Sequence, residues 1–463
     1  MTTPLRIATD RFGLGAVPGE EPPADLRDWL RNQLRRFDPA PAALGNQSER
    51  MARIGEVLAA RNDVARLRRN GGDREAAQMR NRELGVESRE EHWAAIGKRL
   101  GHAVATDTPF AERLVHFWSN HFAISIDKVR QHAFAEDFEF SVIRASIMGN
   151  FGDLVRAAVL HPAMLQYLDQ NISVGPSSNL NATTRREFGF NENLGRELLE
   201  LHTMGVGSGY TQADVTELAL ALTGWTVAGM GNSRIAHGAG GTPGEAVFFA
   251  QMHEPGTRTV LGRRYAQAGA AQADAIIADI VRHPVTARHI AIKLARHFIA
   301  DDPPEAAVSR LAAAFTASGG ELLPVYDALV ELPAVWDAPR DKIRSPWDWL
   351  VASLRAAPGG RDLNDRAAQR LLGLLGQPTW QVGSPAGWGD TAYDWAGSGA
   401  LMTRVEIAAQ LSRRLVGESD PRELATEVLG DALRPATRGA ISGSGDAAMG
   451  FALLIASPEF QRR

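Results

Sequence analysis

One stretch of the sequence, residues 188–226, constrains the fold more than any other. It reads FGFNENLGRELLELHTMGVGSGYTQADVTELALALTGWT. Leucines recur at helical spacing between residues 190 and 204, and a second helical pattern follows Thr211, whose spacing to Asp214 is typical of a capping box. Between them, the glycine-rich run 205–209 suits a left-handed helix stop. The stretch therefore predicts two helices joined by a tight turn.

The polar face of the first predicted helix admits two interpretations. One arc carries five polar residues: Glu192, Asn193, Arg196, Glu197 and Glu200. Glu192, Arg196 and Glu200 follow one another at four-residue intervals and can form a ladder of ion pairs on a solvated face. The alternative is that these side chains line a buried polar site. His202 projects into the opposite, leucine-rich arc, where a hydrogen-bonded core histidine is the commoner role.

Further blocks of the sequence carry a family resemblance. These blocks are RFGLGA at 11–16, FWSNHF at 117–122, FGDLVRAAVLHPAMLQYLD at 151–169, the Gly387-Trp388 step and SPEFQ at 457–461. Together with NEN, REL, LHT and GV in 191–206, YTQ and DV in 210–215 and LTGW at 222–225, they resemble the signature of the bacterial DUF1800 family. The resemblance spans nearly the whole chain and implies a mostly helical fold. It implies little about activity, because the family was named for lacking an assigned function.

The predicted fold class is all-α, a large multi-helix assembly with a small β-hairpin insertion near 246–262. EAVFFAQ and TRTVLGRRY flank residues 252–256 in the pattern of a hairpin, which would place His253 at its tip. Residues 1–105 are predicted to form an N-terminal arm and a charged helical hairpin. Residues 106–463 are predicted to form the main helical domain, with an insertion loop and the hairpin at 227–265.

Composition excludes several classes of function. The 463 residues carry 50 basic and 54 acidic side chains, a net charge of -4, which argues against binding to nucleic acid or to an anionic membrane surface. Without cysteine there can be no disulfide, thiolate metal site or cysteine nucleophile. P-loop, dinucleotide-binding, HExxH and GxSxG motifs are absent. His116 and His121 are five residues apart and cannot share a metal as an i, i+4 pair can, and we predict no metal site.

The sequence also bears on the compartment. No apolar run approaches the roughly 18 residues of a membrane span. The first residues, MTTPLRIATDRFGLG, lack the hydrophobic core of a signal peptide, so the chain as written is expected in the cytoplasm. The family resemblance implies export for many relatives, so export is expected here only if the start is trimmed or a partner carries the chain out.

The tryptophan-rich end suggests one specific chemistry. Six of the ten tryptophans lie between Trp336 and Trp395, and their ordinary role is packing. In Gly387-Trp388-Gly389-Asp390, however, two glycines leave the indole on a closely approachable backbone beside a carboxylate. An indole held near a carboxylate base is what self-oxidation to a quinone requires. The family resemblance implies a tryptophan-derived quinone as the candidate cofactor.

The leading functional hypothesis is an enzyme with a buried polar site between helices, leaning to quinone-dependent oxidoreductase chemistry. The candidate catalytic residues are Glu192, Glu197, His202, His121, Trp388 and Trp225, and the candidate substrate-binding residues are Asn193, Arg196, His253 and Asn120. Glu192 or Glu197 would act as base, and Arg196 would hold an anionic group of a small-molecule or peptide substrate. This hypothesis requires the helix at 190–204 to turn its carboxylates toward His121 and Trp388.

Two alternatives stay open. The first is a metal-assisted hydrolase that uses His121, His202 and Glu197. The second is a non-catalytic helical scaffold, whose protein partner would dock on the glycine-rich loop at 227–242.

Overall fold

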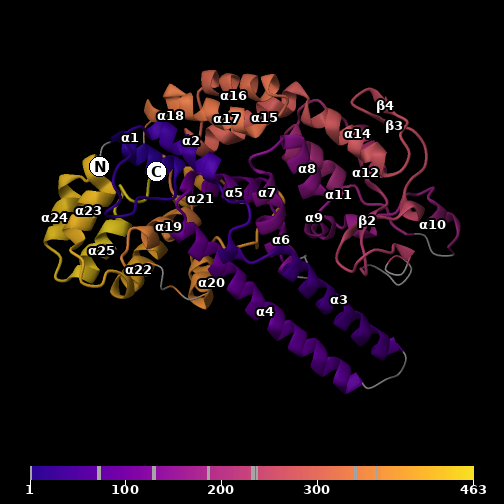
Figure 1. Cartoon of the computed structure of the whole chain (residues 1–463), viewed down its shortest axis with the longest axis horizontal. Helices are drawn as coiled ribbons and strands as arrows, with labels where there is room; N and C mark the ends of the chain where they lie inside the picture. The colour runs from indigo at the N-terminus through magenta and orange to yellow at the C-terminus, as the bar shows by residue number, and fades with distance from the viewer. Residues whose placement is uncertain are drawn as a thin grey trace.

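The computed structural model describes residues 3–69, 74–127, 132–184, 188–230, 235, 238–337, 339, 341–360, 363 and 365–463. The fold is mostly helical, which confirms the predicted class. The helices form an elongated body from which one pair of helices projects (Figure 1). Most of the buried apolar side chains join one continuous core that runs through this body.

The N-terminal residues lie inside the body. The elements here are α1 (Thr3–Arg6), the π-helix η1 (Ile7–Phe12), α2 (Leu26–Arg36) and the 3-10 turn η2 (Ala42–Leu44). Phe12 is fully buried and packs against Phe110 and Phe298, with ring centroids 5.1 and 5.8 Å away. The segment therefore contributes to the main core, while the predicted division of the chain at residue 105 stays a prediction.

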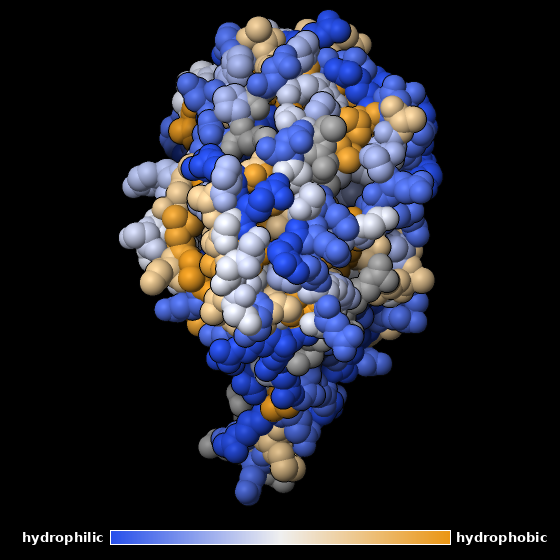
Figure 2. Space-filling view, turned by 90° about the vertical axis from the view of Figure 1, so that its left-hand side faces the viewer, coloured by the Kyte–Doolittle hydropathy of each residue, from blue (hydrophilic) through white to orange (hydrophobic). Residues whose placement is uncertain are grey.

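The projecting arm is a pair of long helices, α3 (Gln47–Arg69) and α4 (Arg74–Ala105). Arg53 on α3 holds Glu87 and Glu91 on α4 at 2.8 and 2.6 Å, so opposite charges join the two helices. Figure 2 shows the arm extending below the body with a mostly hydrophilic surface. The predicted charged helical pair is thus present, and the predicted break at Asn70-Gly71-Gly72 lies outside the described residues.

Helix α5 (Pro109–His121) runs through the centre of the body. Its Trp118 indole is fully buried and donates to the Tyr326 hydroxyl at 2.7 Å. Short helices follow it along the chain: α6 (His132–Asp137), the π-helix η3 (Phe138–Ile143), α7 (Arg144–Ser146), α8 (Phe151–Val159), α9 (Pro162–Tyr167), the 3-10 turn η4 (Gln170–Ile172) and α10 (Asn179–Ala182). Asn150 and His161 cap the N-terminal ends of α8 and α9 through their side chains, which explains where each of these helices begins.

The stretch 188–226 folds as its local signals predict. Helix α11 (Asn193–Glu197) continues into one π-helical turn, η5 (Leu198–Thr203), and Gly205 then takes the left-handed conformation at φ +93°. Helix α12 (Gln212–Leu222) follows, with a complete capping box between Thr211 and Asp214. The first helix begins at Asn193 instead of Phe190.

Four short strands form two antiparallel pairs. β1 (Trp225–Val227) pairs with β2 (Ala246–Phe248), and β3 (Arg258–Val260) pairs with β4 (Arg263–Tyr265). A small hairpin exists as predicted, but β2 does not pair with β3. The hairpin turn is Leu261-Gly262, both at positive φ, as a type I′ turn requires. His253 instead follows the 3-10 turn η6 (Ala250–Met252) between the two sheets, so its predicted position at a hairpin tip is wrong.

The C-terminal half is helical again. Its elements are α14 (Ala270–Val281), α15 (Pro284–Phe298), α16 (Glu305–Ala317), α17 (Leu322–Glu331), α18 (Pro333–Asp337), α19 (Pro346–Arg355), α20 (Asp365–Leu374), α21 (Ala392–Trp395), α22 (Ser398–Leu415), α23 (Pro421–Leu429), the 3-10 turn η7 (Gly430–Ala432), α24 (Pro435–Ser442) and α25 (Ala447–Ala456). Among the residues that the structure describes, no helix is long and apolar enough to cross a bilayer.

Both ends of the chain meet in one place (Figure 1). Arg6 donates to the Glu459 carbonyl at 3.1 Å, and Ile343 forms an antiparallel bridge with Arg462. Arg463 also donates to the His297 carbonyl of α15 at 3.0 Å and lies 3.2 Å from Asp348 of α19, which places it next to the cavity described below.

Candidate functional site

A cavity of about 530 Å³ lies between α5, α15, the start of α19 and the segment 377–394. Polar and charged side chains make up much of its wall: Arg99, Arg113, His116, Ser119, Asn120, His121, Glu139, His289, Lys293, Arg296, His297, Ser345, Asp348, Gln377, Thr379, Asp390, Thr391 and Asp394. Its volume suits a small molecule.

One face of α15 supplies the basic side of the cavity. His283 caps the helix through its ring nitrogen, and Pro284 occupies the first turn, which fixes where the helix begins. His289, Lys293 and His297 then follow at four-residue spacing, which places them on one arc about 80° wide. All three line the cavity.

Lys293 has no hydrogen bond or ion pair within the described part of the chain, although it is half-buried. The pKa of the Lys293 ammonium is lowered from 10.5 to about 8. Burial is the largest cause, the Asp390 charge opposes the shift, and the Arg296 charge adds to it. A lysine in this state is deprotonated in an appreciable fraction of molecules near neutral pH, which an amine needs in order to act as a nucleophile or base.

Three neutral histidines lie close enough to Lys293 for its charge to affect them. Burial lowers the pKa of His202 to about 3 and that of His289 to about 4, and it holds the pKa of His121 well below the usual range. The His121 and His202 rings are 5.9 Å apart, and His121 Nε2 lies 3.1 Å from the His202 carbonyl oxygen. The Lys293 charge disfavours protonation of all three imidazoles, so they stay uncharged at neutral pH.

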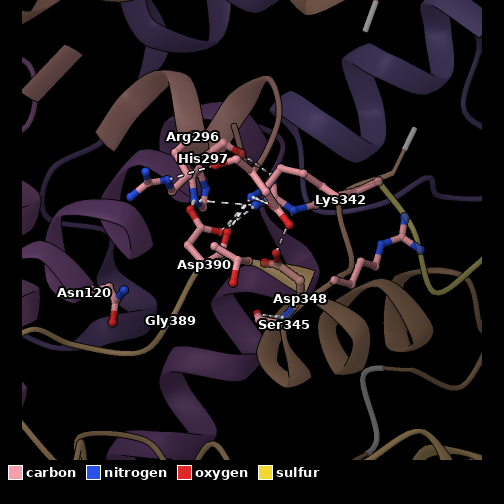
Figure 3. Close-up of polar contacts among 12 residues, drawn as sticks. Asn120, Arg296, His297, Lys342, Ser345, Asp348, Gly389 and Asp390 are labelled. Atoms are coloured by element: carbon pink, nitrogen blue, oxygen red, sulfur yellow. Dashed lines mark hydrogen bonds and ion pairs between the residues drawn. The ribbon is translucent and has the colours of Figure 1, made fainter. Parts of the chain in front are cut away.

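Asp390 is the centre of a charged cluster at the other side of the cavity (Figure 3). Its carboxylate accepts a hydrogen bond from His297 Nδ1 at 2.7 Å, and Lys342 and Arg463 each lie 3.4 Å from it. Burial alone would raise the pKa of Asp390, but these partners hold it well below its usual range. His297 is consequently fixed with its proton on Nδ1, and burial lowers the pKa of this imidazole to about 4.

Asp348, at the first turn of α19, carries the buried charge next to this cluster. It lies 3.1 Å from Arg113 and 3.2 Å from Arg463, and all three side chains are nearly inaccessible to solvent. Burial works to raise the pKa of Asp348, yet the two guanidinium groups hold it well below the usual range. Arg463 bridges Asp348 and Asp390 and so connects the two clusters.

The loop that carries Trp388 is held in place by Asn120. The Asn120 side-chain amide donates to the Trp388 carbonyl at 2.9 Å and accepts from the Trp388 backbone nitrogen at 2.7 Å. Gly387 has φ +80°, and a Cβ there would overlap the Asn120 carbonyl oxygen. Asn120 therefore positions the loop, and the substrate binding predicted for it stays a prediction.

Replacing Gly387 by alanine is expected to destabilise the protein by about 1–3 kcal/mol, because the new Cβ combines a strained backbone with an overlap. Thermal unfolding, followed by tryptophan fluorescence, measures the effect. Gly383→Ala is the matched control in the same loop, since a Cβ at Gly383 meets no atom within 4 Å. Equal melting temperatures for the two variants would contradict the proposed role of the Asn120 clamp.

The structure brings some of the predicted site residues together. His121, Asn120 and Trp388 line the cavity, as the first hypothesis requires. His202 lies behind this wall, fully buried as predicted for the leucine-rich arc, with both ring nitrogens unpaired within the described residues.

The polar face at 192–200 packs beside α12 and does not line the cavity. Glu192 accepts hydrogen bonds from Thr216 at 2.5 Å and from Gln212 at 2.8 Å, both on α12. Arg196 lies 3.4 Å from both Glu192 and Glu200, which confirms the predicted ion-pair ladder. None of these residues lines the cavity. The expectation that this helix turns its carboxylates toward His121 and Trp388 is therefore wrong, because its charged arc packs beside α12.

The remaining predicted residues are also away from the cavity lining. Asn193 is exposed, and Glu197 is half-buried beside the Glu200 and Arg196 charges, where burial raises its pKa. Trp225 and His253 lie on either side of Phe248, with ring centroids 5.7 and 5.3 Å from it. His253 Nδ1 is 2.9 Å from the Thr223 carbonyl oxygen, a contact that ties the strand segment to the end of α12.

Three residues of the cavity wall, His289, Lys293 and His297, were not predicted as site residues, although their spacing in the sequence is distinctive. His289, Lys293 and His297 recur at helical spacing, and the chain has only four lysines: Lys98, Lys128, Lys293 and Lys342. In a chain that otherwise uses arginine, a lysine on the same arc as two histidines indicates a position where a deprotonatable group is needed.

Comparison with known proteins gives the family. A family model described as "Protein of unknown function (DUF1800)" matches residues 7–462. The chain belongs to the DUF1800 family. The matched range includes every residue that lines the cavity of this DUF1800 protein. No curated protein and no solved structure matches the chain.

The arrangement of the potential donor residues bears on metal binding by this DUF1800 protein. In the part of the chain that the structure describes, no group of three or more histidine, cysteine, aspartate and glutamate side chains is placed to hold a metal ion. The proposed set of His121, His202 and Glu197 is not brought together there, because Glu197 lies beside Arg196 and Glu200.

Proposed function

We propose that this DUF1800 protein is an enzyme that acts on small carbonyl compounds, with Lys293 as the reacting amine. The observation that carries the proposal is the half-buried Lys293 side chain at the cavity wall, with a pKa of about 8 and without a partner among the described residues. About a tenth of such an amine is uncharged at pH 7, against less than about a thousandth for an ordinary lysine.

The surrounding residues support this chemistry. The Lys293 amine would add to the carbonyl carbon of the substrate, and loss of the carbonyl oxygen as water would leave an imine. Proton transfer to and from the adduct requires a base that is neutral at working pH. His297 meets this requirement, because Asp390 holds its Nδ1 proton and its Nε2 has no partner within the described residues.

Reductive trapping tests the proposal directly. The protein is incubated with acetaldehyde and sodium cyanoborohydride, digested, and analysed by peptide mass spectrometry. We expect the ethyl adduct on Lys293 to form several times faster near pH 7 than the adduct on Lys98, an exposed surface lysine on the α4 arm. Lys293→Met should abolish that adduct and leave the one on Lys98 unchanged. Slower modification of Lys293 than of Lys98 would overturn the proposal.

A second candidate function is supported by a contact between Trp388, which lines the same cavity, and Trp395, which is not among its lining residues. The Trp388 and Trp395 rings lie 6.1 Å apart at 51°, and the Trp395 indole donates to the Gly389 carbonyl at 2.8 Å. We propose as the second candidate that two molecules of dioxygen oxidise this pair to a cross-linked quinone, with Asp394 as the nearby base, and that the protein is an oxidoreductase. Two oxygen atoms enter one indole as the quinone, the cross-link replaces one C–H bond on each ring, and the four displaced hydrogens leave with the other two oxygen atoms as water.

An absorption spectrum and a peptide map decide the second candidate. A visible band, together with loss of the separate Trp388 and Trp395 peptides in favour of one cross-linked, oxygenated species, would support the quinone. Unmodified masses for both peptides in protein purified from its native source would reject it. If both this measurement and trapping at Lys293 fail, the non-catalytic scaffold becomes the better hypothesis.

A further inference from the structure

We infer that the substrate carries a carboxylate as well as a carbonyl group, so that the ligand class of the cavity is a small oxo acid. The inference rests on the proposed role of Lys293 and goes further, because it assigns Arg296 to substrate binding. The charged side chains that line the cavity differ in whether they have a counter-ion within the protein.

The carboxylates of the cavity wall all have partners of their own. Glu139 pairs with Arg99 at 2.5 Å, and Asp348 pairs with Arg113 at 3.1 Å. Asp390 is held by His297 and Lys342 as described above. Asp394 accepts hydrogen bonds from the Thr391 hydroxyl and backbone nitrogen at 2.6 and 2.9 Å in a capping box. These contacts leave the acidic side chains engaged within the protein.

Two cations of the same wall have no such partner. Within the described residues, neither Lys293 nor Arg296 forms an ion pair with a carboxylate. Among the described residues, the only side-chain hydrogen bond of Arg296 runs from Nε to the Asp301 backbone carbonyl at 3.1 Å, and its guanidinium group extends away from the Asp390 cluster (Figure 3). Both terminal nitrogens of this guanidinium group are thus available to an anion from outside the chain.

The spacing of the two cations suits one small ligand. Lys293 and Arg296 are three residues apart on α15, and side chains at this spacing lie about 5–6 Å apart at Cβ. A carboxylate on Arg296 would place an adjacent carbonyl carbon near the Lys293 amine. Arg296 is exposed, whereas Lys293 is half-buried, so the carboxylate would lie at the mouth of the cavity and the carbonyl group deeper inside.

Unpaired polar atoms in the wall provide an independent observation. His121 is 2% exposed and its Nδ1 has no hydrogen-bond partner among the described residues, and the same holds for the Ser119 hydroxyl. Buried polar atoms are rarely left unpaired unless a ligand or water completes them. Since both residues belong to the cavity wall, a ligand with polar groups, or water, can form these hydrogen bonds, which fits the proposed oxo acid.

The test compares two aldehydes that differ by a carboxylate. Glyoxylate and acetaldehyde are each trapped on the full-length protein with sodium cyanoborohydride, and the adduct on Lys293 is quantified by peptide mass spectrometry. In each case the amine adds to the aldehyde carbon, water leaves with the carbonyl oxygen, and hydride from the reagent reduces the imine to a secondary amine. The quantity of interest is the ratio of the two trapping rates, because intrinsic reactivity cancels when variants are compared.

We expect Arg296→Gln to lower the glyoxylate-to-acetaldehyde ratio about tenfold, since one charge-assisted contact is lost. Arg288→Gln is the matched control, because Arg288 lies on the same helix and pairs with Glu305 at 2.6 Å, away from the cavity. This variant should leave the ratio unchanged. Lactate, which has the carboxylate but no carbonyl group, should protect Lys293 against an amine-acylating reagent in the wild-type protein.

The other possible outcomes distinguish the two claims, which are carboxylate binding by Arg296 and carbonyl chemistry at Lys293. An unchanged ratio in Arg296→Gln, or the same fall in Arg288→Gln, overturns the assignment of Arg296. A failure of both aldehydes to modify Lys293, with protection by lactate retained, rejects the carbonyl chemistry and leaves the carboxylate site standing. Absence of both trapping and protection overturns both claims.

Discussion

Replacing Asp348 by asparagine is expected to lower the free energy of unfolding by about 3–5 kcal/mol. The carboxylate is 7% exposed and lies 3.1 Å from Arg113 and 3.2 Å from Arg463. The amide keeps the shape of the side chain but removes the charge, so the buried Arg113 guanidinium loses its carboxylate partner and Arg463 keeps only Asp390 within the described part of the chain. Burial already lowers the pKa of Arg113 to about 10, which shows how unfavourable the position is for a cation. Chemical denaturation with urea measures the loss.

The control for this variant is an exposed ion pair. Asp63 lies 3.0 Å from Arg66 on α3, and both side chains are more than half exposed. Asp63→Asn should change the stability by less than about 1 kcal/mol, because surface ion pairs contribute little. If the two asparagine variants lost similar stability, the buried cluster could not be the source of the effect.

The Asp348 carboxylate also predicts how stability depends on pH. Its pKa in the folded protein is held below the ordinary value by Arg113 and Arg463, against the opposing effect of burial. A depressed folded pKa stabilises the protein above the unfolded pKa of about 3.9, and this contribution is lost as the pH falls further toward the folded pKa. The wild-type protein should therefore lose stability below about pH 4 more steeply than Asp348→Asn.

Replacing Lys293 by methionine is expected to stabilise the protein, in contrast to Asp348→Asn. We expect the free energy of unfolding to rise by about 1–3 kcal/mol. The variant removes a charge that burial makes unfavourable, since the folded pKa of Lys293 is about 8 instead of 10.5. Between these two values the unfolded chain binds more protons than the folded one, so wild-type stability should rise with pH across this window. The charged neighbours Asp390 and Arg296, and the neutral histidines 121, 202 and 289, stay in place in the variant.

Lys342→Met is the matched control for this prediction. Lys342 is also buried, but it lies 2.8 Å from Asp301 and 3.4 Å from Asp390 and donates to the Asp390 carbonyl at 2.6 Å. Among the residues that the structure describes, its removal leaves Asp301 without a cation and Asp390 with Arg463 alone, and should destabilise the fold by about 2–4 kcal/mol. Destabilisation by Lys293→Met of the same size would show that Lys293 has a structural partner and would count against its role as a free amine.

Local signals explain the parts of the fold that the sequence predicted well. The capping box at Thr211 and the left-handed Gly205 are set by residues close in sequence, so the two helices and their turn could be derived from residues 188–226 alone. The same holds for the ion-pair ladder on Arg196, whose partners lie four residues away on the same helix.

Contacts between distant residues explain the errors. β2 pairs with β1 across about twenty residues instead of with β3, and sequence pattern alone does not distinguish the two partners. The carboxylates at 192–200 were assigned to the site because they are dense in the sequence, but α12 covers their arc. The cavity instead draws Asn120, Lys293 and Asp390 from three separate segments, and no spacing in the chain predicts that they meet.

Contacts between segments that are far apart in the sequence determine how quickly the cavity can assemble. Arg344 holds Asp10 at 2.7 Å, Arg113 donates to the Gly13 carbonyl at 2.6 Å, and Arg463 joins Asp348 to Asp390. Each of these contacts closes a long loop of the chain, and long loop closures slow folding. We therefore expect the wall of the cavity to be completed late in refolding.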